Sequence, residues 1–398
     1  MKARHNLQVL LAGQVFSTVL ACQQPSSLPT AWPLSTPVDR PLLLQGPHSC
    51  VDDVCVYSDP AFGNGLSVVT TAANADFLGD RLRLPLAGNI ISPTPFYESY
   101  IIGKGIGLVA NATIRRGERL MVHTPTLLVH WPTHAKEETQ NDTEWLYKMA
   151  LEKLPAPSRN VFSQQMHIGG SGVRANIETN CFRFFLDGGH DESTGHLGCF
   201  PSAARLNHDC EPNLHYTITD GIQSIVAVRD ISPGEELSIS YVDLMLPSTE
   251  RKARLHDWGF ECGCRLCKDL KKEKEADARL EEIARLKTML DTGDAAISLE
   301  TGHRLVALYR EQPGLGLYIG QQAYTRAALI CGLFADEECA VDYARKAVEA
   351  LHLELGAVVA ASSQDVLSME RLAASPKTHW AWGLLKDRDR SKDKERTV

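Results

Sequence analysis

Three cysteines within six residues constrain this chain more than any other feature of its sequence. They lie in the string Cys262-Gly-Cys-Arg-Leu-Cys267. Neighbours this close pair poorly with one another as disulfides, whereas three thiolates leave zinc one ligand short of a closed tetrahedral site. Cys210, in a second unusual string, is an attractive fourth ligand. A disulfide stays open for a secreted chain, but we favour structural zinc, which would shape a pocket without taking part in the chemistry.

The composition is that of an ordinary globular protein with two or three domains. Of the 398 residues, 43% are hydrophobic and 23% are charged, which excludes a disordered, collagen-like or coiled-coil chain as a whole. Lys and Arg number 41 and Asp and Glu number 49, so the net charge is −8. This argues against binding of nucleic acid through the overall charge of the protein, although a local basic patch is not excluded. Eleven cysteines are too few for a scaffold built on disulfides.

The first 21 residues have the pattern of a secretory signal peptide. A short basic start is followed by the uncharged run Leu7–Ala21, with a cleavage site expected before Cys22. A short buried helix is the alternative. A permanent membrane span is disfavoured because the run is shorter than about 20 residues and is interrupted by Gln14. Residues 22–48 are rich in Pro and Ser and predict an exposed linker.

Entry into the secretory pathway would give further residues a role. Cys50 and Cys55 would become candidates for a small disulfide loop. Asn111-Ala-Thr113 and Asn141-Asp-Thr143 would become glycan acceptors. Such triplets are frequent by chance, so neither is specific.

The pattern of hydrophobic residues along the chain predicts an α+β protein. Alternating runs and turns indicate strands, and the spacing of apolar residues in Glu144–Leu154 indicates a helix. We expect an N-terminal β segment at 49–96, a main β domain at 97–243 with a helical insert at about 135–167, a cysteine segment at 244–268, an α-helical region at 269–385 and a charged tail at 386–398.

One pattern occurs twice within the main β domain. The strings Ile114-Arg-Arg-Gly-Glu-Arg-Leu120 and Ile231-Ser-Pro-Gly-Glu-Glu-Leu237 both have the form I-x-x-G-E-x-L. Each has a glycine suited to a turn, followed by a strand. The repetition predicts two hairpin edges of one β domain.

Three further strings are candidates for a binding or catalytic role. Gly103-Lys-Gly-Ile-Gly-Leu108 is followed by a segment that is not helical, so it does not fit a dinucleotide fold. It predicts either a hairpin turn or a backbone against which a bulky cofactor lies. Arg205–Asn213 crowds polar side chains into a loop that could fold on its own hydrogen bonds. Tyr241 ends a strand, and a tyrosine there is more often part of the core or rim than catalytic.

In this order, these strings resemble those of SET-domain protein-lysine methyltransferases. The resemblance covers about residues 97–267, with post-SET cysteines after Gly259-Phe260. The helical insert and helical C-terminal part are similar to divided-SET proteins, particularly fungal ones and the SET/MYND group. The cysteine-rich MYND finger is missing.

The resemblance implies a β-rich fold of short sheets wrapped into a pseudoknot, with S-adenosylmethionine in a cleft. It implies that Tyr241 is catalytic and that Phe260 covers the adenine or shapes the lysine channel. Cys210, Cys262, Cys264 and Cys267 would bind the post-SET zinc. The other implied cofactor-binding residues are Lys104, Gly105, Ile106, Gly107, Leu108, Leu206, Asn207 and His208.

The function implied is methylation of a lysine in a protein substrate, histone or non-histone, by S-adenosylmethionine. A catalytically silent SET scaffold that docks a partner on its C-terminal helices is one alternative, and a secreted zinc-stabilised binding protein is another. Intact Tyr241, Asn207 and His208 favour the enzyme. The compartment stays open, because the N-terminus indicates secretion whereas the resemblance implies nucleus or cytoplasm.

Overall fold

The computed structural model describes residues 41–83, 93–136, 140–189 and 191–386. The expected signal peptide, most of the 22–48 linker and nearly all of the charged tail lie outside the described residues. The chain forms two compact units. Among the described residues, one unit contains 41–243 and 251–262, and the other contains 244–250 and 263–386.

The strands all belong to the first unit and form three small sheets. They are β1 (Cys50–Val51), β2 (Val54–Asp59), β3 (Leu66–Thr71), β4 (Phe96–Ile101), β5 (Gly105–Ala110), β6 (Arg119–His123), β7 (Leu127–His130), β8 (Cys181–Phe185), β9 (Gly195–Cys199), β10 (Asn207–His208), β11 (Leu214–Thr219), β12 (Ile222–Ala227) and β13 (Glu236–Ile239). Their orders are β1-β2-β3-β7-β9-β8, β10-β13-β5-β4 and β11-β12-β6. Only the pairs β3/β7 and β10/β13 are parallel among the described strand pairs.

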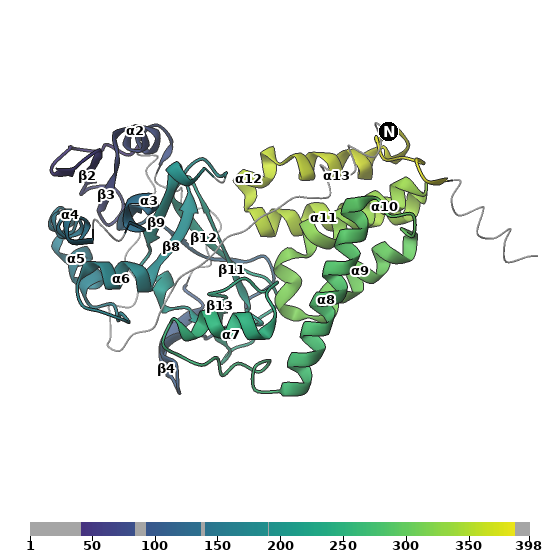
Figure 1. Ribbon diagram of the computed structural model, residues 1–398, viewed down its shortest axis with the longest axis horizontal. Coiled ribbons are helices and arrows are strands. Elements are labelled where there is room, and N and C mark those ends of the chain that lie inside the picture. The colour runs from purple at the N-terminus through teal and green to yellow at the C-terminus, as the bar shows by residue number, and fades with distance from the viewer. Residues whose placement is uncertain (1–40, 84–92, 137–139, 190, 387–398) are drawn as a thin grey trace, which may run out of the picture. The chain divides into compact units, whose positions relative to one another are not determined.

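Short helices cover the six-stranded sheet. In this unit the helices are α2 (Ala72–Arg81), α3 (Trp131–His134), α4 (Gln140–Glu152), α5 (Ala156–Ser163), α6 (Val173–Asn180), η2 (Glu192–Thr194) and η3 (Ala203–Arg205). Helix α4 lies beside β2 and β3 (Figure 1). Leu146, Tyr147, Ala150 and Leu151 form its buried face at helical spacing. The helix at Glu144–Leu154 was therefore predicted correctly, apart from its start and end.

The repeated I-x-x-G-E-x-L pattern has a direct structural counterpart. Ile114 and Ile231 form an antiparallel bridge in which each N–H donates to the other's carbonyl, at 3.0 and 2.8 Å. Both are almost completely buried. Gly117 and Gly234 have positive φ angles of 86° and 88°, as each turn requires. The two copies are thus paired neighbours in the same unit, as expected for one β domain. They are not two edges of one sheet, because β6 is an edge strand of the three-stranded sheet whereas β13 lies inside the four-stranded sheet.

The other unit is helical in its described part. Its elements are α8 (Leu270–Thr292), α9 (Leu299–Glu311), η4 (Pro313–Tyr318), η5 (Gly320–Tyr324), α10 (Thr325–Leu333), α11 (Glu337–Leu355), α12 (Ala357–Ser362), α13 (Gln364–Ala374) and η6 (Pro376–Thr378). Helix α7 (Ser248–His256) contains residues of both units. Asp269 begins α8 by accepting the N–H groups of Lys271 and Lys272, and Gly293 ends it in the left-handed region.

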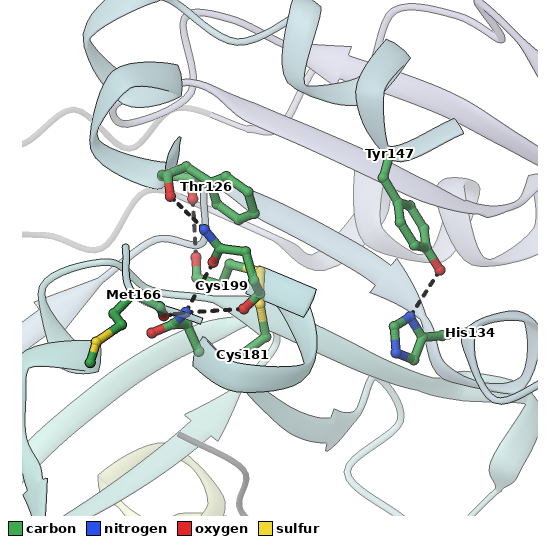
Figure 2. The surroundings of a disulfide bond; sticks show 9 residues. Thr126, His134, Tyr147, Met166, Cys181 and Cys199 are labelled. Carbon is green, nitrogen blue, oxygen red and sulfur yellow. Dashed lines mark hydrogen bonds between the residues drawn. A yellow bond between two sulfur atoms is a disulfide. The ribbon is translucent and has the colours of Figure 1, made fainter. Parts of the chain in front are cut away.

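Six cysteines pair in three disulfides within the described residues: Cys50–Cys55, Cys181–Cys199 and Cys331–Cys339. The first is the loop considered from the sequence. Figure 2 shows Cys181 and Cys199 bonded, with the Thr126 hydroxyl donating to the Cys199 carbonyl at 3.2 Å. These two cysteines face each other across β8 and β9, and both are fully buried.

The α+β class predicted from the sequence is confirmed, with short sheets and a helical C-terminal region. No helix in the described part of the chain is both long and apolar enough to cross a membrane.

Candidate functional site

The four-stranded sheet brings residues 105–110 together with residues 207–208 and 236–239. Strand β10, which carries Asn207 and His208, runs parallel to β13, with Asn207 opposite Ser238. Strand β13 pairs in turn with β5, with Leu237 opposite Leu108. The glycine-rich string, the Asn-His string and the strand before Tyr241 therefore form one continuous surface.

Glu236 joins the three segments through its carboxylate. One oxygen accepts from Lys104 Nζ at 2.7 Å and the other accepts from Asn207 Nδ2 at 2.8 Å. Lys104 Nζ also donates to the carbonyl of His208 at 3.4 Å. Because the Asn207 amide nitrogen donates to Glu236, its Oδ1 is directed away from that carboxylate.

Gly107 is required by the close approach of these groups. A Cβ at this position would lie 2.6 Å from Asn207 Nδ2, 2.9 Å from Ile101 Cγ1 and 3.2 Å from Glu236 Oε1. Contacts under 3.0 Å are essentially never seen for real Cβ atoms. The absence of a side chain at Gly107 therefore lets the Asn207–Glu236 hydrogen bond form against β5.

Tyr241 lies inside the unit beside the Asn-His string. Its side chain is 1% exposed, and its hydroxyl donates to the Leu206 carbonyl at 2.8 Å. The ring lies near those of Trp258, His208 and Phe260, with centroids 5.2, 5.4 and 6.3 Å away. The phenol is thus fixed by one hydrogen bond in largely aromatic surroundings.

His208 is held in one tautomer by its two neighbours. The backbone N–H of Tyr241 donates to His208 Nδ1 at 3.0 Å, so Nδ1 carries no proton. The proton of the neutral ring is then on Nε2, which lies 3.3 Å from Cys210 Sγ and donates to it.

Arg205, at the start of the same string, forms an ion pair with β4. Its Nε lies 3.4 Å from Glu98 Oε1, and only 4% of its side chain is exposed. Burial lowers the pKa of Arg205, although the nearby Glu98 carboxylate opposes this shift. The pair fixes η3 against the edge strand that precedes the glycine-rich string.

The remaining predicted residues occupy the same region. Leu206 and Leu108 are buried in the core that contains Tyr241, while Phe260 packs partly buried against that core. Gly105 and Ile106 are half-buried at the start of β5. Gly105 has a φ of 81°, which a residue with a side chain rarely adopts.

The four predicted metal ligands also meet. The Sγ atoms of Cys210, Cys262, Cys264 and Cys267 all lie within 4.8 Å of one another. Cys210 and Cys262 have their sulfurs 3.9 Å apart. The backbone N–H of Cys267 donates to Cys264 Sγ at 3.4 Å. The disulfide alternative for these cysteines is not observed.

The sequence analysis did not single out Glu236, Trp258 or Glu98. Glu236 follows Glu235 directly, and only the side-chain alternation along β13 distinguishes the two carboxylates. Glu235 instead binds the exposed Arg229 at 2.9 Å. Strand register was therefore the missing signal for Glu236, and no sequence signal marked Trp258 or Glu98.

Comparison with known proteins matches residues 105–242 to the family model described as SET domain. The histone-lysine N-methyltransferase set5 of Schizosaccharomyces pombe is 27% identical over 291 residues, which are 70% of this chain and 83% of that protein. The N-lysine methyltransferase SMYD2 of Gallus gallus is 41% identical over 101 residues, which are 25% of this chain and 22% of that protein. SMYD2 of Rattus norvegicus is 39% identical over 142 residues, or 35% of this chain and 30% of that protein.

The chain thus spans less than a third of the length of these SMYD2 proteins. The family match begins one residue after Lys104 and ends one residue after Tyr241. It therefore covers β5, β10 and β13 of the four-stranded sheet, but neither β4 nor Lys104.

Proposed function

We propose that this chain, whose residues 105–242 match a SET domain, is an S-adenosylmethionine-dependent protein-lysine N-methyltransferase. One observation supports this most strongly. The glycine-rich string, Asn207-His208 and the buried phenol of Tyr241 meet through the β10-β13-β5 sheet.

The donor set fits the proposed cofactor. Asn207 Oδ1 is directed away from Glu236 and suits an ammonium group, and residues Lys104–Ile106 are half-buried at the start of β5 in the same sheet. Leu206, Gly107, Leu108, His208 and Phe260 complete the residues expected to hold the molecule. S-adenosylmethionine, when bound, supplies a methyl group on a positively charged sulfur.

Tyr241 is the residue proposed to act on the lysine amine. Its hydroxyl donates to the Leu206 carbonyl at 2.8 Å, which fixes the position of the phenol oxygen. A phenol oxygen is a hydrogen-bond acceptor, and we propose that it accepts an N–H of the amine. This would orient the nitrogen lone pair, and holding reactants in a reactive geometry can supply about 7–11 kcal/mol. The surrounding rings of Trp258 and Phe260 exclude water, which disfavours the ammonium form of the lysine.

Zinc is the metal proposed for the four cysteines. Tetrahedral Zn–S bonds of about 2.3 Å require sulfurs about 3.8 Å apart. The 3.9 Å between the sulfurs of Cys210 and Cys262 is close to that requirement, and no two sulfurs of the set are more than 4.8 Å apart. Four thiolates close the coordination sphere, so the role proposed is structural. Docking of a partner on the C-terminal helices stays a prediction.

Methyl transfer from labelled S-adenosylmethionine to a proteome extract tests the function. Label recovered as N-methyllysine after hydrolysis is expected with the wild type and should fall at least tenfold with Tyr241→Phe and Asn207→Ala. Tyr97→Phe is a matched control, because Tyr97 lies on β4 with its side chain 47% exposed. Equal labelling by the wild type and Tyr241→Phe would remove the catalytic assignment. Absence of labelling by all forms would favour the silent scaffold.

A further inference from the structure

We propose that Asn111 is an N-glycosylation site and that the chain folds in an oxidising secretory compartment. Two independent observations carry this inference, which goes beyond methyl transfer and does not depend on it. One is the exposure of an acceptor triplet on a fixed turn. The other is the pairing of six cysteines.

The triplet Asn111-Ala-Thr113 lies directly after β5, and all three of its residues are exposed. Backbone hydrogen bonds fix the chain on both sides of it. The Asn111 N–H donates to the Pro95 carbonyl at 2.9 Å, and the Ile114 N–H donates to the Ile231 carbonyl at 3.0 Å. The side chains of Asn111 and Thr113 therefore project from a defined turn that leaves room for a bulky, solvated substituent.

The disulfides identify the compartment in which such a substituent is added. Protein disulfides form and persist in oxidising compartments and are rare in the cytosol and nucleus. In the described part of the chain they lie in both units, at Cys50–Cys55, Cys181–Cys199 and Cys331–Cys339. Cys181, Cys199 and Cys331 are at most 1% exposed. Their disulfides would therefore form while the chain folds, and not by later oxidation of thiols at the surface.

The proposed modification transfers an oligosaccharide to the side-chain amide of Asn111. The Asn111 Nδ2 would form a bond to the anomeric carbon of an oligosaccharide carried on a polyprenyl diphosphate. The anomeric carbon–oxygen bond would break, polyprenyl diphosphate would leave, and the amide would lose one proton. The compartment's oligosaccharyltransferase would supply the catalysis, with the hydroxyl of Thr113 as the required third residue of the triplet.

The second triplet differs in structure. Asn141 lies in the first turn of α4, and Thr143 is 1% exposed. The Thr143 hydroxyl donates to the Gln140 carbonyl at 3.1 Å. Because Asn141 could still be modified before the chain folds, it is removed in the test, so that any remaining N-glycan reports on Asn111.

The test uses the full chain with its own N-terminus, produced in a eukaryotic cell. In the Asn141→Gln background, peptide N-glycosidase should increase the electrophoretic mobility of the protein. The increase should persist with Thr113→Ser, because serine supplies the same hydroxyl, and should disappear with Asn111→Gln and with Thr113→Ala. In the wild type, glycosidase should convert Asn111 to aspartate in the tryptic peptide 105–115, which needs no variant to be folded.

Two results would overturn the proposal. One is an unmodified asparagine in the 105–115 peptide of the wild-type protein. The other is a glycosidase-sensitive shift that survives both Asn111→Gln and Thr113→Ala. Asn111 lies three residues beyond Leu108, the nearest proposed cofactor-binding residue along β5, which is about 10 Å at the rise of a strand. Asn111→Gln should therefore leave any methyl transfer within twofold of the wild type, which serves as a check on folding.

Discussion

Adding one methyl group at Gly107 should disrupt the candidate site from within. An alanine Cβ would lie 2.6 Å from Asn207 Nδ2, where ordinary contacts begin at 3.4 Å. The amide would thus have to move by about 0.8 Å, away from its 2.8 Å hydrogen bond to Glu236. Overpacking costs about 1–3 kcal/mol, and a hydrogen bond to a charged group contributes about 1.5–3 kcal/mol. Because these contributions overlap, we expect Gly107→Ala to lower the free energy of unfolding by about 3 kcal/mol.

Urea denaturation followed by fluorescence measures this change. Gly79→Ala is the matched control, since Gly79 lies within helix α2 with nothing within 4 Å of an added Cβ. It should stabilise the protein by up to about 1 kcal/mol, as alanine replaces glycine in a helix.

A double-mutant cycle then isolates the cause of the loss. In an Asn207→Ala background the nearest clashing atom is gone, so Gly107→Ala should cost at least about 1 kcal/mol less than in the wild type. Two results would refute the steric argument. One is a loss of less than about 0.5 kcal/mol in the free energy of unfolding when Gly107→Ala is introduced into the wild type, and the other is an equal loss in the wild type and in the Asn207→Ala background.

Three further predictions concern groups outside the proposed catalytic residues. Burial lowers the pKa of His196 from 6.5 to about 3, so its contribution to stability is present above pH 6.5 and is lost as the pH falls. Because other buried histidines such as His123 also have lowered pKa values, the loss of stability from pH 7 to 5 measured by urea denaturation should be about 2 kcal/mol smaller in His196→Gln than in the wild type, and unchanged in the control His352→Gln. Replacing both Cys181 and Cys199 by alanine opens a loop of sequence separation 18 and should cost about 3 kcal/mol by the same assay; no change in midpoint would contradict the pairing. Elemental analysis should find one zinc per chain, lost with Cys264→Ser, and a metal-depleted wild type that keeps its unfolding midpoint would exclude a structural role.

Sequence alone predicted much of the fold, because the relevant signals are local. The I-x-x-G-E-x-L turns depend on glycines with positive φ, and the buried face of α4 depends on helical spacing; both can be read within one segment. The tight cysteine string likewise excluded pairing among neighbours by geometry. The α+β class followed from these signals.

Other features depend on which strands meet and in what register. Cys181 and Cys199 pair because β8 and β9 place them opposite each other. Glu236 bridges Lys104 and Asn207 because β13 lies between β5 and β10. Neither arrangement produces a recognisable spacing of residues along the chain, so neither could be predicted from the sequence.

The central claim is that one sheet surface binds the methyl donor while the adjacent phenol orients the amine. Equilibrium dialysis with labelled S-adenosylmethionine, followed by transfer of the bound label to lysine, tests both parts on one sample. We predict one donor bound per chain in the wild type and in Tyr241→Phe, with N-methyllysine formed at a substantial rate by the wild type alone. Failure of the wild-type chain to bind the donor, or undiminished transfer by Tyr241→Phe, would contradict the claim.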